Sequence, residues 1–161
     1  MTVIAPTSYH SPADSPGFWF LGTKMTLRAS GDTTRGAFGL IEQVAPAGFA
    51  APPHIHRGED EAFFLLSGAA RFHSGPNLID ARAGSLVWLP RDQQHWFEVD
   101  AEGPATLLQL NTPAGLERFF VEMGTPLDVS ANPPAGAPDF GRLNELAARY
   151  RIELLPGVSA R

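Results

Sequence analysis

The sequence predicts an all-β barrel or sandwich of antiparallel strands, followed by one or two helices. Runs rich in β-branched and aromatic residues are short and recur at about ten-residue spacing, which is typical of sandwiches and barrels. The chain also contains 16 glycines and 15 prolines, and these residues interrupt most of the gaps between the runs. After residue 112 the apolar residues change to a spacing of three and four, which indicates amphipathic helices.

The chain divides into three segments in order. Residues 1–16 hold several prolines and serines, so we expect an N-terminal arm without regular structure. Residues 17–112 form the predicted barrel, and residues 113–161 form a C-terminal helical segment that packs on it. The expected strands lie at residues 18–29, 37–44, 61–66, 69–73, 77–81, 85–89, 95–99 and 105–111, and a further extended stretch contains residues 54–56.

Two helices are expected in the C-terminal segment. Thr112 suits an N-cap and Pro113 suits the first helical position, so the first helix is expected to start there and to end at Gly124. The second helix follows the Pro/Gly/Ala-rich connection of residues 125–138. The apolar faces of the two helices are Leu116, Phe119, Phe120 and Met123, and Leu143, Leu146, Ala147 and Tyr150.

Composition excludes several functional classes. Twelve basic residues against 17 acidic ones give a net charge of -5, so we expect no nucleic-acid partner. The absence of cysteine excludes disulfides, thiolate metal sites and cysteine nucleophiles, so any metal must be held by histidines and carboxylates. The chain has no long apolar run and no basic, apolar leader, so we expect a cytoplasmic protein that does not enter a membrane.

Two histidines and a glutamate have a spacing that suits a shared metal ion. His54 and His56 are two residues apart, so on an extended backbone both imidazoles leave the same face of the strand. Glu61 follows a short glycine-containing connection, and a hairpin there would return its carboxylate beside the histidines. The neighbouring Glu59 and Asp60 fit better as solvated turn residues.

His95 is the fourth candidate ligand, because it begins a strand after the turn that follows Pro90. Three imidazoles and one carboxylate suit one divalent transition-metal ion, and Fe, Mn, Co, Ni, Cu and Zn all remain open. A six-coordinate ion with these four ligands keeps two positions open for substrate, water or O2. His10 and His73 lie outside this pattern and are expected at the surface.

These two stretches resemble the two signature motifs of the cupin superfamily, over about residues 36–111. In the second motif, Asp92 stands where the family has glycine and Val99 where it has asparagine. The resemblance implies a jelly-roll β-barrel of two antiparallel sheets and a metal site made of His54, His56, Glu61 and His95. The matching positions are Gly48, His54, His56, Glu61 and Gly68 in the first motif, and Gly84, Pro90 and His95 in the second.

Flanking segments extend the resemblance to single-domain bacterial cupins of the quercetin 2,3-dioxygenase-like group. They are residues 18–22, the Pro52-Pro53 pair and residues 111–120. The resemblance implies a metal-dependent dioxygenase, an oxidoreductase that cleaves a flavonol-like or other enolisable aromatic substrate with O2. Glu61 would then be both a ligand and the catalytic base that takes the substrate's hydroxyl proton. It also implies a homodimer, which an exposed apolar run at residues 18–21 would suit.

The alternation of side chains along strands predicts a substrate pocket. Phe63, Leu65 and Phe97 share the parity of Glu61 or His95 and are expected to line it. No organic cofactor is expected. The alternate residues, which are expected to face a second layer or a partner subunit, are Phe64, Leu66, Trp96 and Leu108.

Two other functional classes remain open. One is a non-oxidative metal-dependent cupin, such as a polyketide cyclase or an isomerase, in which the ion polarises the substrate as a Lewis acid. The other is a non-catalytic cupin that binds a small molecule. Oxygen uptake with a flavonol separates the dioxygenase from both alternatives, and ring closure of a polyketone separates the first alternative from the second.

Overall fold

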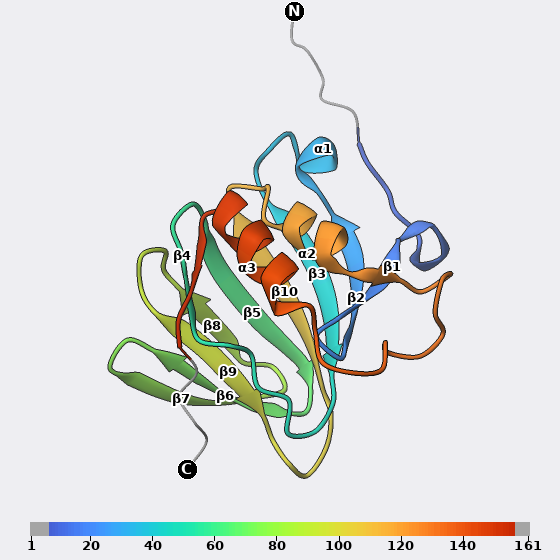
Figure 1. Ribbon diagram of the computed structural model, residues 1–161. Coiled ribbons are helices and arrows are strands. Elements are labelled where there is room, and N and C mark those ends of the chain that lie inside the picture. The colour runs from blue at the N-terminus through green and yellow to red at the C-terminus, as the bar shows by residue number, and fades with distance from the viewer. Residues whose placement is uncertain (1–6, 157–161) are drawn as a thin grey trace, which may run out of the picture.

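Two antiparallel β-sheets form the body of the protein, and the computed structural model describes residues 7–156 (Figure 1). This arrangement confirms the predicted jelly roll. Within those residues the larger sheet has the strand order β11-β1-β2-β3-β10-β5-β8, and the smaller sheet has the order β12-β4-β9-β6-β7. The strands are β1 (Gly17–Phe20), β2 (Thr23–Ala29), β3 (Gly39–Ala45), β4 (His54–His56), β5 (Asp60–Ser67), β6 (Ala69–Ser74), β7 (Asn77–Arg82), β8 (Leu86–Leu89), β9 (His95–Val99), β10 (Ala105–Thr112), β11 (Thr125–Pro126) and β12 (Ile152–Leu154).

The N-terminal part contains more structure than the sequence indicated. The run at residues 18–29 is two strands, because Leu21 and Gly22 adopt φ values of 48° and 81° and turn the chain between β1 and β2. The arm expected without regular structure carries a short 3-10 helix, Pro12–Asp14, and residues 1–6 of that arm lie outside the described residues. A one-turn helix, α1 (Gly31–Thr34), connects β2 to β3.

The C-terminal segment contributes to both sheets as well as supplying helices. α2 (Glu117–Met123) begins later than expected, because Thr112 is still part of β10 and its hydroxyl donates to the Ala37 carbonyl. α2 ends at Gly124, where a Cβ atom would lie 2.6 Å from the Phe18 ring. β11 then pairs with β1, and β12 pairs with β4 after α3 (Phe140–Arg149).

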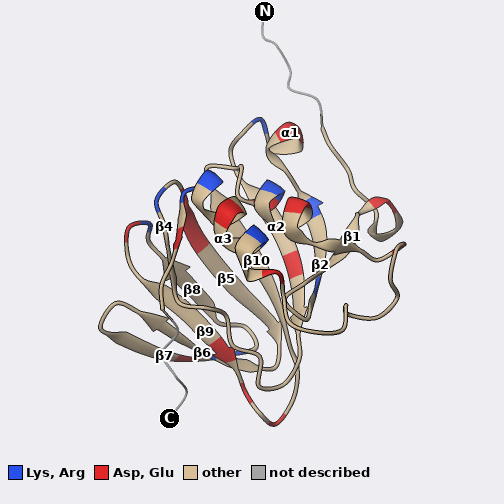
Figure 2. Cartoon of the chain, in the orientation of Figure 1, with Lys and Arg blue, Asp and Glu red and all other residues tan. Residues whose placement is uncertain are grey.

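Helices α2 and α3 pack against the barrel and against each other (Figure 1). Leu143, Leu146 and Ala147 are the buried face of α3, as its spacing predicted. Figure 2 shows acidic and basic residues side by side on both helices, where Glu122 of α2 accepts hydrogen bonds from Arg149 and from the Tyr150 hydroxyl, each at 2.8 Å. No helix within residues 7–156 is long and apolar enough to cross a membrane.

The apolar run at residues 18–21 is not the exposed surface that we expected for a dimer. Phe18 and Phe20 are buried, and the Phe20 ring packs edge-on against Phe119 and Phe120 of α2. A group of four exposed apolar side chains lies instead on the outer face of the larger sheet, near its edge strand β8. We call Phe64, Leu66, Leu86 and Trp88 the outer patch.

Candidate metal centre

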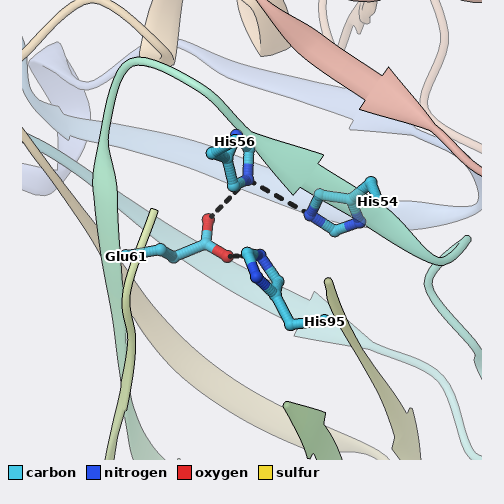
Figure 3. Close-up of side chains that lie close together, drawn as sticks. All are labelled: His54, His56, Glu61 and His95. Atoms are coloured by element: carbon cyan, nitrogen blue, oxygen red, sulfur yellow. Dashed lines mark hydrogen bonds and ion pairs between the residues drawn. The ribbon is translucent and has the colours of Figure 1, made fainter. Parts of the chain in front are cut away.

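β4 presents two of the predicted ligands to the barrel interior. His54 and His56 alternate with Ile55, and their imidazole Nε2 atoms lie 3.1 Å apart (Figure 3). The Nδ1 atom of His54 lies 2.7 Å from the Pro52 carbonyl oxygen. A carbonyl only accepts hydrogen bonds, so Nδ1 carries the proton and the neutral ring directs the Nε2 lone pair to the centre of the group.

β9 supplies His95 from the strand next to β4, where it pairs in register with His54. The Nδ1 atom of His95 lies 3.0 Å from the Gln93 carbonyl oxygen, so this ring is held in the same tautomer as His54. Its Nε2 atom is buried without a hydrogen-bond partner among the described residues and lies 3.3 Å from Glu61 Oε2. Each of the two rings therefore turns an unprotonated nitrogen inward.

Glu61 reaches the histidines from the opposite sheet. The prediction of a hairpin between His56 and Glu61 is wrong. β4 belongs to the smaller sheet, whereas β5, which carries Glu61, belongs to the larger one. The connection between them crosses the edge of the barrel, so the carboxylate faces the imidazoles across the interior (Figure 3). Glu61 Oε1 lies 3.7 Å from His56 Nε2, and the Glu61 residue is 2% exposed.

Two buried amides hold this carboxylate, and the sequence interpretation missed both. Gln109 Nε2 and Asn111 Nδ2 donate to Glu61 Oε1 at 2.6 and 2.9 Å. Both residues are on β10, at the inward positions that Ala105 and Leu107 occupy earlier in the strand. The signal that could have identified them is that these polar residues follow apolar ones at the alternate, inward-facing positions of the same strand.

The electrostatics of the group favour a bound cation. Burial and the neighbouring rings of His56 and His95 lower the pKa of His54 to about 3, so His54 is neutral near pH 7. Burial also lowers the pKa of His56. Burial works against ionisation of Glu61, but the imidazoles of His56 and His95 outweigh it and the carboxyl pKa lies below its usual range.

The four side chains fit one metal ion. One ligand atom from each of His54, His56, Glu61 and His95 can be chosen so that all four lie within 4.8 Å of one another. Neutral imidazole nitrogens and an ionised carboxylate are a donor set for divalent transition metals. The hydrogen bonds from two of the rings to carbonyls and from two amides to the carboxylate are the outer contacts that metal ligands commonly have.

The loops that carry the ligands are tied together at the surface. Asp92, which stands where the cupin motif has glycine, adopts φ 64°, a conformation that aspartate tolerates better than most residues. Its backbone N–H donates to the His56 carbonyl at 2.8 Å, and its carboxylate accepts from Arg57 at 3.1 Å. The backbone N–H and the guanidinium of Arg91 both donate to the Asp60 carboxylate, at 2.9 and 2.8 Å. The turn before His95 is therefore bound to both ends of the β4–β5 connection.

A largely apolar cavity opens onto the metal centre. Phe63 and Phe97, which share the strand parity of Glu61 and His95, line this cavity. Leu65 does not line it, because it lies two residues further along β5 in the closely packed core and is fully buried. The space within the cavity that water can occupy is about 70 Å³. The other side chains that line it include Phe20, Met25, Gln43, Leu89, Trp96, Phe119, Phe120, Leu143, Ile152 and Leu154.

The remaining histidines lie away from the centre. His73 faces outward from β6, stacks on Trp96 with ring centroids 4.2 Å apart, and lies 3.4 Å from Glu98. His10 is exposed in the N-terminal arm. Trp96 is half-buried and Phe64 and Leu66 are exposed, in agreement with their outward parity, although Trp96 also borders the cavity.

Comparisons with known proteins agree with this architecture. A cupin domain model matches residues 40–111, and no curated protein matches the chain. An RmlC-like cupin from Shewanella frigidimarina is 13% identical, with a TM-score of 0.59 over 68% of this chain and 94% of that one. Streptomyces Pac13, a nucleoside dehydratase, is 16% identical, with a TM-score of 0.55 over 70% and 88%. KdgF from Halomonas is 14% identical, with a TM-score of 0.54 over 60% and 84%.

At these identities the structural relatives show the fold and not the reaction. The domain match and the two-sheet barrel agree on the fold, and the motif residues lie around one centre inside the barrel. Residues 40–111 match the cupin domain model, and the chain has the two-sheet barrel fold that it shares with the solved cupin structures.

Proposed function

We propose that this protein is a metal-dependent enzyme whose ion is held by His54, His56, Glu61 and His95. The observation that carries the proposal is the convergence of four donors, three of them buried, with outer contacts that orient His54, His95 and Glu61 inward. Fe, Mn, Co, Ni, Cu and Zn are the candidate ions. A bound ion would act as a Lewis acid that lowers the pKa of a substrate hydroxyl and polarises a carbonyl oxygen.

The reaction we propose first is dioxygenation of a small, enolisable aromatic substrate with O2. The phenyl rings of Phe63 and Phe97 and the apolar residues from α2 and α3 would hold the ring and exclude water. Glu61 Oε2 is the carboxylate oxygen that no amide binds among the described residues, so it is the atom that would accept the substrate's hydroxyl proton. The limited space in the cavity favours a compact ring over a three-ring flavonol unless the helices move.

A non-oxidative reaction is the second candidate, because Glu61 is held firmly. Its Oε1 atom accepts from two amides, which stabilise the ionised carboxylate and lower its affinity for a proton. A carboxylate held in this way suits a permanent ligand better than a base that leaves the ion. The ion would then orient and polarise the substrate for an isomerisation or a cyclisation.

Elemental analysis of the purified protein, followed by reconstitution with each candidate metal, tests the proposed function. A site of this kind should take up one ion per chain. Oxygen consumption with small enolisable aromatic compounds, such as hydroxypyranones, would then support the dioxygenase. Conversion of the same compounds without oxygen uptake would support the second candidate. Failure to retain any of the metals would contradict both.

A further inference from the structure

An amide oxygen without a partner lies beside the cavity. Gln43 is on the inner face of β3, is 3% exposed and lines the cavity. Its Oε1 atom has no hydrogen-bond partner among the described residues. Its register neighbours, Met25 on β2 and Leu107 on β10, have apolar side chains that cannot donate to it.

The orientation of the Gln43 amide is fixed by Thr23. The Thr23 hydroxyl donates to the Phe20 carbonyl at 2.7 Å, so its oxygen is left to accept a hydrogen bond from Gln43 Nε2 at 3.2 Å. A flipped amide would place its oxygen against this acceptor unless Thr23 gave up the Phe20 carbonyl. Thr23 is fully buried, so water does not compete for these bonds. Oε1 is therefore the buried end of the amide that is left without a partner among the described residues.

Gln43 differs in this respect from the other cavity-lining amide. Gln109 also faces inward, and its Nε2 atom donates to Glu61, so its place in the metal centre is clear. Gln43 makes no contact of this kind with a metal ligand. A buried acceptor without a donor is unfavourable, and in proteins it commonly marks the place of a ligand or an ordered water.

We propose that Gln43 recognises the substrate by accepting a hydrogen bond from a hydroxyl or N–H group. This inference rests on the proposed function, since it assigns a ligand to the same cavity. Apart from Gln43, Gln109 and the four residues of the metal centre, the side chains that line the cavity are largely apolar, with Met25, Phe20 and Phe120 among them. The ligand is therefore a small, mainly apolar molecule that carries one donor group in addition to the oxygen that meets the metal.

Binding of matched small alcohols and ethers tests the assignment. The probes are phenol, benzyl alcohol and 2-phenylethanol, each compared with its methyl ether, which has lost the donor. Dissociation constants are measured for the parent protein and for Gln43→Met, which keeps the length of the side chain and removes the amide. Glu42→Met is the matched control, because Glu42 is next in the same strand and pairs with Arg28 on the outer side. Gln43→Glu keeps an acceptor at the position.

In the parent and in Glu42→Met, at least one alcohol should bind about ten-fold tighter than its ether, in both metal-free and metal-loaded protein. The preference should fall below two-fold in Gln43→Met and persist in Gln43→Glu. The proposal would be overturned if Gln43→Met kept the preference of the parent for the alcohol, or if the parent preferred no alcohol over its ether. An ordered water on Oε1 that remains when the alcohol is bound would also overturn it. Metal uptake is measured separately, so failure of the metal centre is distinguishable from failure of this assignment.

Discussion

Asn111→Leu should weaken metal binding without touching a metal ligand. Asn111 is 1% exposed and donates to Glu61 Oε1 at 2.9 Å, while leucine has a similar size and no donor. A hydrogen bond to a charged group contributes about 1.5–3 kcal/mol. Because every 1.4 kcal/mol corresponds to about ten-fold in affinity, the loss should be on the order of 10–100-fold, as for other outer contacts of metal sites.

Competition with a chromophoric chelator, using Co or Zn as the ion, measures this affinity directly. Thr112→Val is the matched control, because Thr112 is the next residue of β10 and its hydroxyl donates at 2.9 Å to the Ala37 carbonyl, away from Glu61. The control should retain the parent affinity. If Asn111→Leu binds the ion within two-fold of the parent while both variants remain folded, the amide does not support the ligand and the account of Glu61 is wrong.

Four further outcomes are expected. His56→Ala should lose the ion and melt at a lower temperature in metal-containing buffer, whereas His73→Ala should keep its metal content; the reverse pattern in elemental analysis would misplace the fourth ligand. Glu61→Gln should lower metal affinity about 10–100-fold and turnover at saturating metal about 10²–10⁴-fold if Glu61 is the base, and a change in turnover of only a few-fold would remove that role. The pKa of His54 falls from 6.5 to about 3 on folding, so below pH 6.5 the unfolded chain takes up a proton that the native state does not. The urea midpoint of the metal-free protein should therefore decrease as the pH is lowered from 6.5 toward 3. A His54→Asn variant with the same dependence on pH would contradict this. We propose that a second copy covers the outer patch, so sedimentation should give about twice the 17.3 kDa chain mass and Trp88→Lys should give the monomer; a monomeric parent would refute the dimer.

Local sequence signals predicted most of the barrel strands because glycine, proline and polar turns separate them. The division of residues 18–29 into β1 and β2 was missed because Leu21 holds a positive φ that leucine rarely adopts. β11 and β12 have two and three residues, and such short strands exist only through pairing with β1 and β4. Their formation depends on contacts between distant parts of the chain, which a local pattern does not contain.

The ligand residues of the candidate site could be predicted from the sequence, but the way the fold brings them together could not. Parity placed His54 and His56 on one face, and the cupin resemblance selected Glu61 and His95. Glu61 reaches the site from the opposite sheet, which depends on which strands pair and could not be predicted from the four-residue gap after His56. The same holds for the closure of the cavity by Phe119, Phe120 and Leu143, since amphipathic spacing gives a buried face but not the surface that it covers.

The most direct test of the central claim is anomalous diffraction from crystals grown with one candidate metal, measured on both sides of its absorption edge. The account predicts a single strong peak within about 2.0–2.2 Å of one atom from each of His54, His56, Glu61 and His95. If protein exposed to excess metal shows no peak among these four side chains, the result would contradict a metal centre at this place in the barrel.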